Sequence, residues 1–104
     1  MKPNSLEHKI MVEAALNIRD LLEVCLPENF ECGQIHSRTG RCGYVKFMVI
    51  PDVNFGGGYM VVIKDGVINV YFGERHALPT AEFNMADPDC FDRVVDHIMD
   101  AEGL

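Results

Sequence analysis

The sequence predicts an α+β fold: a single antiparallel β-sheet of about five strands flanked by an N-terminal and a C-terminal helix, in the order α-β-β-β-β-β-α. Three observations predict it. Apolar residues recur at helical spacing over residues 5–26 and 87–101, and short β-branched and aromatic runs fill the region between them. The connections between those runs are short enough for hairpins, so neighbouring strands are antiparallel. The 104 residues are expected to form one domain, residues 1–104.

The stretch from residue 58 to residue 74 is predicted to be a β-hairpin. Asp65-Gly66 supplies the two positive-φ positions of a type I′ turn. If Lys64 pairs with Val67, one face of the hairpin carries Tyr59, Val61, Ile63, Ile68, Val70 and Phe72. The other face is still half apolar and carries Met60, Val62, Lys64, Val67, Asn69 and Tyr71. Because an isolated hairpin is marginal in water, this one must belong to a larger sheet.

The first helix is predicted over residues 5–26, with Asn4 as its N-cap and Glu7 completing a variant of the capping box. Its apolar arc is about 200° wide, which is more than a helix on one sheet face needs. The arc comprises Leu6, Ile10, Met11, Ala14, Ala15, Ile18, Leu21, Leu22, Val24, Cys25 and Leu26. Val12 and Leu16 lie outside it, among charged residues. Either the helix is wedged between two layers of its own domain, or it packs against a second copy or a partner protein.

Two strands are predicted between this helix and the hairpin, at residues 30–37 and 43–50. Pro27 ends the helix, because proline cannot continue it. The second run, GYVKFMVI, is almost wholly β-branched or aromatic. A turn at residues 38–41 is expected to join the two strands. A short strand at residues 81–85 then forms an edge of the sheet.

The last helix is predicted to begin at Asp87-Pro88, because aspartate is a good N-cap and proline is favoured at the first helical position. It should end near Ala101. Its buried face follows the i, i+3, i+4, i+7 spacing through Phe91, Val94, Val95, Ile98 and Met99. Carboxylates run along another face at Asp89, Asp92, Asp96 and Asp100. A solvated surface explains such a stripe, and so does contact with a basic surface of another protein.

Sixteen acidic and nine basic residues give the chain a formal net charge of −7. This balance argues against direct binding of nucleic acid by counterion release. The charge is uneven, because residues 32–51 contain Arg38, Arg41 and Lys46 but no carboxylate. No apolar run approaches the ~20 residues of a membrane span. The first residues do not follow a signal-peptide pattern, so the expected compartment is the cytoplasm.

Cys32, His36 and Cys42 are the residues considered for a metal site. Zinc prefers thiolate and imidazole ligands, but the spacing C-x3-H-x5-C matches no common structural zinc pattern. A fourth ligand, such as His76 or Cys90, would have to come from elsewhere in the chain. A disulfide between Cys32 and Cys42 is also disfavoured, since the predicted turn sets Cys32 opposite residue 45 or 46. We therefore expect neither a metal nor a cofactor, and cysteines that act as small buried hydrophobes.

No arrangement typical of catalysis is predicted, so we expect that the chain is not an enzyme. Cys90 and His97 lie seven residues apart on the last helix, too loosely placed for a nucleophile and its base. The glycine-rich run at residues 54–58 lacks the lysine and hydroxyl residue of a phosphate loop and leads into a strand. A small-molecule pocket near this run and His76 remains an alternative.

Surplus apolar surface is the main functional signal. If both helices cover one face of the sheet, several apolar side chains stay uncovered, and these normally mark an interface. With the carboxylates of the last helix, the predicted partner-binding residues are Val12, Leu16, Met60, Val62, Val67, Tyr71, Asp89, Asp92, Asp96 and Asp100. Two copies could bury the surplus by stacking their sheets or by exchanging the first helix.

The sequence therefore favours a small acidic cytoplasmic regulator that inhibits or sequesters a partner protein. We expect a homodimer, and a partner with a basic or apolar surface. An anti-activator of a transcription regulator, an immunity protein and a phage-type inhibitor of host defence all fit this description. One alternative is an α+β module that binds a small molecule or a metal, which includes the case of an enzyme. Another is a structural assembly subunit.

Overall fold

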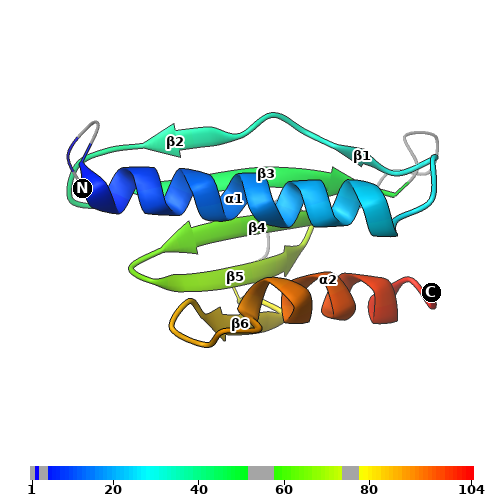
Figure 1. Cartoon of the computed structure of the whole chain (residues 1–104). Coiled ribbons are helices and arrows are strands. Elements are labelled where there is room, and N and C mark those ends of the chain that lie inside the picture. Colours follow the sequence, from blue (N-terminus) through cyan, green and yellow to red (C-terminus); the bar gives the residue numbers. More distant parts are fainter. Residues whose placement is uncertain (1, 3–4, 52–57, 74–77) are drawn as a thin grey trace.

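The predicted order of helices and strands is confirmed, with the first strand divided into two. The computed structural model describes residues 2, 5–51, 58–73 and 78–104. The elements, drawn in Figure 1, are α1 (Leu6–Cys25), β1 (Glu31–Cys32), β2 (His36–Arg38), β3 (Tyr44–Ile50), β4 (Tyr59–Lys64), β5 (Val67–Phe72), β6 (Ala81–Asn84) and α2 (Cys90–Ala101).

The strands form an antiparallel meander. β3 pairs with β4, β4 with β5 and β5 with β6, and the free side of β3 is shared by β1 and β2. Both helices lie on the same side of this sheet: α1 packs on β1, β3 and β4, α2 packs on β6, and the two helices contact each other (Figure 1). The sheet thus has a covered face, under the helices, and an open face on the other side.

The central hairpin has the predicted register. Lys64 lies opposite Val67, and Asp65 (φ 52°) and Gly66 (φ 74°) supply the positive φ angles that the tight turn needs. The predicted inner residues of the hairpin lie on the covered face and are buried, except for Phe72 at the end of its strand: Tyr59, Val61, Ile63, Ile68 and Val70.

The core fills the space between the covered face and the helices. From β3 it takes Val45, Phe47 and Val49. From α1 it takes Met11, Ala14, Ala15, Ile18 and Leu22, and from α2 Cys90, Val94, Val95 and Ile98. Phe91 and Met99, also predicted for this face of α2, are half-buried and pack against the core. The helical spacing of the last helix was therefore a correct guide to its buried side.

The first strand is interrupted at residues 33–35. β1 pairs Cys32 with Val49, whereas β2 pairs His36 with Lys46, so the register shifts by one residue between them. The segment contains one extra residue, as in a β-bulge. This extra residue sets Cys32 on the covered face and His36 on the open face. The prediction that Cys32 lies opposite residue 45 or 46 was wrong, because it placed the turn too early and had no bulge.

The start of each helix differs from the prediction. Ser5, not Asn4, caps α1: its side-chain oxygen accepts a hydrogen bond from the N–H of His8 at 3.1 Å. α2 begins at Cys90 rather than at Asp87-Pro88. The reason is that the Asp87 N–H donates to the carbonyl of Asn84 at 3.0 Å, which makes Asp87 part of the turn after β6.

The end of α2 is where the sequence predicts it, at Ala101. Gly103 follows with a positive φ of 75°. The Leu104 N–H donates to the Met99 carbonyl at 2.9 Å and the Gly103 N–H to the Asp100 carbonyl at 3.1 Å. These two bonds form a Schellman motif, which satisfies carbonyls that the last helical turn would otherwise leave unpaired.

Candidate binding surfaces

The open face of the sheet carries the apolar residues predicted for it. Directly opposed residues form two neighbouring rows across the strands. One row consists of Met48, Met60 and Tyr71. The other consists of His36, Lys46, Val62, Asn69 and Glu82. The four predicted binding residues of the hairpin, Met60, Val62, Val67 and Tyr71, all lie on this face and are half-buried. The structure thus brings these four together in one contiguous surface.

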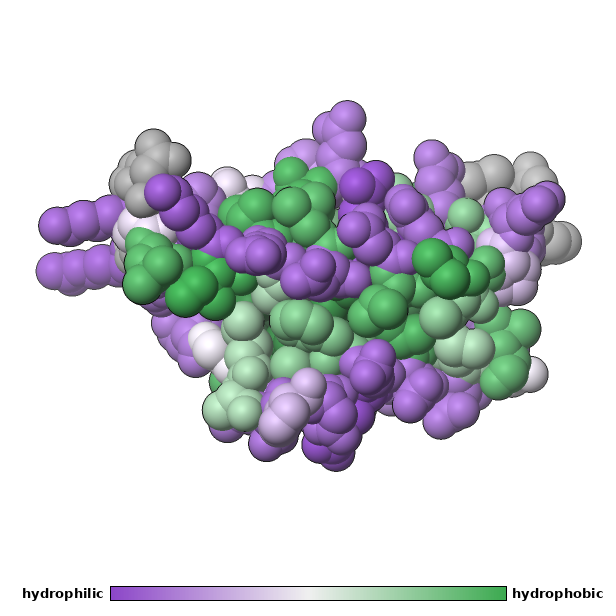
Figure 2. Space-filling model, in the orientation of Figure 1, coloured by the Kyte–Doolittle hydropathy of each residue, from purple (hydrophilic) through white to green (hydrophobic). Residues whose placement is uncertain are grey.

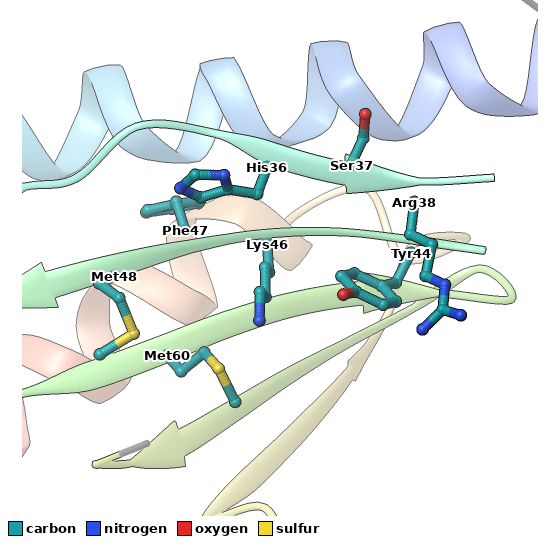
Figure 3. A pocket seen from close by; sticks show the side chains of 8 residues that line it. All are labelled: His36, Ser37, Arg38, Tyr44, Lys46, Phe47, Met48 and Met60. Atoms are coloured by element: carbon teal, nitrogen blue, oxygen red, sulfur yellow. The ribbon is translucent and has the colours of Figure 1, made fainter. Parts of the chain in front are cut away.

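One corner of the open face is basic. A depression of about 690 Å³ is lined there by side chains that include Arg38, Tyr44, Lys46 and Met60. Figure 3 shows Tyr44, Lys46 and Met60 on the same side of their strands, with Ser37 pointing the other way. The ammonium of Lys46 lies 5.4 Å from the centre of the Tyr44 ring, a cation–π contact. This corner is positively charged although the chain as a whole is acidic.

The acidic stripe of α2, formed by Asp89, Asp92, Asp96 and Asp100, is exposed along its whole length. At helical spacing it lies opposite the buried residues Cys90, Val94 and Ile98, and therefore on the outer side of α2. The stripe and the apolar open face are on opposite sides of the molecule. The predicted binding residues thus belong to two separate surfaces.

The exposed apolar residues of α1 are mostly not those that the sequence indicated. Val12 is half-buried and packs against the core, while Leu16 is 43% exposed. Leu6 and Val24, which the sequence placed in the buried arc, are 75% and 85% exposed. They lie in the first and last turns of α1, on the side of the helix that faces away from the buried Ile18 and Leu22.

An apolar groove lies at the start of α1. It has a volume of about 490 Å³, and the residues that line it include Leu6, Ile10, Met11, Gly66, Met85 and Ala86. These residues come from α1, from the turn between β4 and β5, and from the connection between β6 and α2. Figure 2 shows hydrophobic surface near this end of α1 and between the two helices. The groove could not be predicted from the sequence, because it forms only where three distant segments meet.

The potential zinc ligands do not converge. Cys32 and His36 lie on opposite faces of the sheet, and Cys42 is exposed in the loop before β3. Among the residues that the structure describes, no three His, Cys, Asp or Glu side chains are placed to hold a metal ion. Burial raises the pKa of the Cys32 thiol to about 11, and the nearby Glu23 carboxylate adds to the effect. This favours the thiol over the thiolate that zinc would bind.

Cys90 and His97 have separate partners. The Cys90 thiol is buried, points at the carbonyl of Met85 at 3.9 Å, and has its pKa raised by burial. His97 Nε2 lies 3.1 Å from Thr80 Oγ1, and its ring packs edge-on against Phe83 at 6.0 Å. Both side chains therefore tie α2 to neighbouring segments, and the raised pKa makes Cys90 a weaker nucleophile than an ordinary cysteine.

Most of the glycine-rich run lies outside the described residues, as does His76. Its last member, Gly58, has a φ of +135°, and a Cβ atom there would lie 2.7 Å from the Val49 carbonyl oxygen. Only glycine fits this conformation and this close approach. Gly58 therefore has a structural role where β4 begins.

No family model matches the chain, and no curated protein or solved structure is significantly similar to it. Neither α1 nor α2, the helices in the described part of the chain, has the length and apolar character needed to cross a membrane. Because no similar protein indicates a function, the helix layer, formed by α1 and α2, and the open face of the sheet are the features that bear on it.

Proposed function

We propose that this protein is a small cytoplasmic regulator that binds a partner protein through its helix layer and thereby inhibits or sequesters that partner. The observation that carries the proposal is the apolar groove between the start of α1 and the connection that leads from β6 into α2, the helix that carries the acidic stripe. An apolar anchor in a groove supplies affinity, and surrounding charge steers and orients the partner. The matching surface would be an apolar side chain flanked by lysine or arginine.

The groove supports binding because its rim consists of large aliphatic side chains in contact with solvent. Leu6 is 75% exposed and Ile10 is 48% exposed, on adjacent turns of α1. Met85 and Gly66 lie on the opposite side of the groove. Concave apolar surface of this kind is a common site for an anchoring side chain from another protein.

The stripe supports a basic partner because its charge is left uncompensated. Arg93 is the cation of α2, but its guanidinium lies 3.8 Å from the Asp87 carboxylate and over the Phe83 ring. It is thus turned towards β6 rather than along the stripe. Aspartates three and four residues apart repel each other by a few tenths of a kcal/mol per pair. Cations of a partner would relieve this repulsion.

Binding assays with matched variants test the proposal. A partner captured from the source organism, once purified, should bind the Ile10→Asp variant at least ~10-fold more weakly, because a carboxylate in the groove excludes an apolar anchor. Val24→Asp makes the same kind of change on the same helix, away from the groove, and should bind normally. Equal binding of both variants, or a captured partner whose activity the protein does not alter, would contradict the proposal.

Neutralising the stripe tests its separate role. Replacing Asp92, Asp96 and Asp100 with asparagine should lower the association rate several-fold at low salt and by less at high salt, since steering by charge is screened. Stopped-flow or surface-binding kinetics measure this rate. An association rate that is unchanged at low salt would remove the stripe from the mechanism.

A further inference from the structure

We infer that the open face of the sheet binds a second copy of this chain, by stacking of the two sheets about a two-fold axis that runs parallel to the strands, midway between β4 and β5. This surface is distinct from the helix layer of the proposed function. The inference rests on the apolar centre of the open face and on the way that its charges are arranged from β3 to β6.

The centre of the open face is apolar where a sheet exposed to water is normally polar. Met60 and Val62 on β4 neighbour Val67 and Tyr71 on β5, and all four are half-buried with both helices on the other side. A second layer would bury them completely. Apart from Asn69 on β5 and Lys64 at the end of β4, the polar residues of the open face lie towards the edges, on β2, β3 and β6, which is the pattern of a stacked interface.

The two charged ends of the row through Val62 are complementary to each other. The row runs from Lys46 on β3, through Val62 and Asn69, to Glu82 on β6. A two-fold axis between β4 and β5 exchanges β3 with β6, so Lys46 of each copy faces Glu82 of the other. Stacked sheets lie about 10 Å apart, a gap that opposed lysine and glutamate side chains bridge together. The interface would therefore contain this ion pair twice.

The neighbouring rows support the same axis. Met60 and Tyr71 are directly opposed across β4 and β5, so the axis sets Met60 of one copy against Tyr71 of the other, a favourable sulfur–aromatic contact. Lys64 and Val67 are opposed in the same way, so Lys64 would face Val67. An axis along β4 itself would instead bring the two Lys64 ammonium groups together. Charge repulsion thus favours the axis between the strands.

Both charged residues are available for such pairs. Within the part of the chain that the structure describes, Glu82 is exposed and neither Glu82 nor Lys46 forms an ion pair. The Lys46 ammonium contacts the Tyr44 ring. The helices lie on the covered face, so stacking of the open faces leaves both helix layers outermost. The dimer would then offer two copies of the surface used in the proposed function, which raises avidity for a multivalent partner.

Charge reversal with the purified full chain tests the inference. Sedimentation equilibrium should show a dimer at micromolar concentration. Lys46→Glu and Glu82→Lys should each raise the dissociation constant about 10-fold or more, because each sets like charges opposite each other twice. The double variant, with the charges exchanged, should return to within about 3-fold of the wild type. Lys9→Glu, the same charge change on the exposed side of α1, should have no effect.

Val62→Asp is the complementary test at the centre, and it should weaken the dimer at least ~100-fold. Circular dichroism and urea unfolding of each variant establish that it is folded. A wild-type monomer at all concentrations, or a dimer indifferent to Val62→Asp, would show that the open face does not bind a second copy. A double variant as weak as the single ones would overturn the proposed axis. These outcomes are independent of partner binding by the helix layer.

Discussion

The two faces of the sheet are formed by the same strands and differ in what covers them. On β3, Val45, Phe47 and Val49 point under the helices and are at most 1% exposed, while Lys46 and Met48 alternate with them on the open face and stay half-buried. Both faces carry large apolar side chains. Those on the covered face stabilise the folded chain, whereas those on the open face contribute fully only when another surface covers them. Stability and association therefore depend on different residues of the same strand.

The largest difference in unfolding free energy between the two faces should appear at neighbouring positions of β3. Phe47→Ala leaves a cavity in the core, and we expect it to lower the free energy of unfolding by 3–5 kcal/mol. Met48→Ala removes a half-buried side chain from the open face and should lower it by about 1 kcal/mol. Urea denaturation of both variants at one protein concentration measures the difference. Similar losses would mean that the open face is as well packed as the covered face.

A smaller difference in unfolding free energy is expected between variants of two tyrosines of the hairpin. The Tyr59 hydroxyl donates a hydrogen bond to the Glu102 carboxylate beneath the helices, and its ring packs edge-on against Phe72. Tyr71 lies on the open face and forms no hydrogen bond within the described residues. Tyr59→Phe should cost about 1–2 kcal/mol of unfolding free energy, and Tyr71→Phe less than about 0.5 kcal/mol. Denaturation curves that rank the two in the opposite order would contradict this assignment.

Tyr59 should also make the covered face sensitive to alkali. Burial raises the pKa of Tyr59, and its hydrogen bond to Glu102 raises it further. A pKa raised in the folded state means that the folded chain holds the proton more tightly than the unfolded chain. The protonated Tyr59 hydroxyl therefore makes its full contribution to the free energy of unfolding below about pH 10, the ordinary tyrosine pKa. This contribution is lost as the pH rises above that value. Tyr59→Phe should flatten this decline in urea midpoints, whereas Tyr71→Phe should not.

The smallest effect on stability, with a clear chemical readout, is expected at the cysteines. Cys32 has a pKa of about 11 and Cys90 is buried, whereas Cys25 and Cys42 are exposed. A thiol reagent at about pH 8.5 should therefore modify Cys25 and Cys42 first, because the thiolate reacts. The stabilising contribution of the Cys32 thiol is present below about pH 8.5, the ordinary thiol pKa, and is lost as the pH rises towards 11. Peptide mass mapping of labelled cysteines gives the order, and early labelling of Cys32 would contradict its place under α1.

Much of the sheet could be predicted from the sequence because its signals are local. Asp65-Gly66 determines the turn and its register, and the register determines that Met60, Val62 and Tyr71 share a face. This alternation is a property of any strand, so it required no knowledge of what lies above or below. The prediction that one face stays half apolar followed from the same register.

Features that depend on contacts between distant segments could not be predicted. The sequence signal for the bulge at residues 33–35 is Gly33, and a glycine alone does not specify an extra residue. The arc of α1 contained Leu6 and Ile10, but which part of the arc faces α2 depends on the position of α2. The groove that these two residues line also needs Met85, which the sequence assigned to the end of a strand.

The edges of the sheet set a limit on larger assemblies. One edge is β6, which spans only Ala81–Asn84, and the other is split into β1 and β2 by an irregular segment. Neither provides a long, unbroken line of backbone donors and acceptors to which a further chain could add a strand. Growth into ribbons or fibrils by edge pairing is thus disfavoured by the backbone itself, and high concentrations of this protein should yield finite particles rather than filaments.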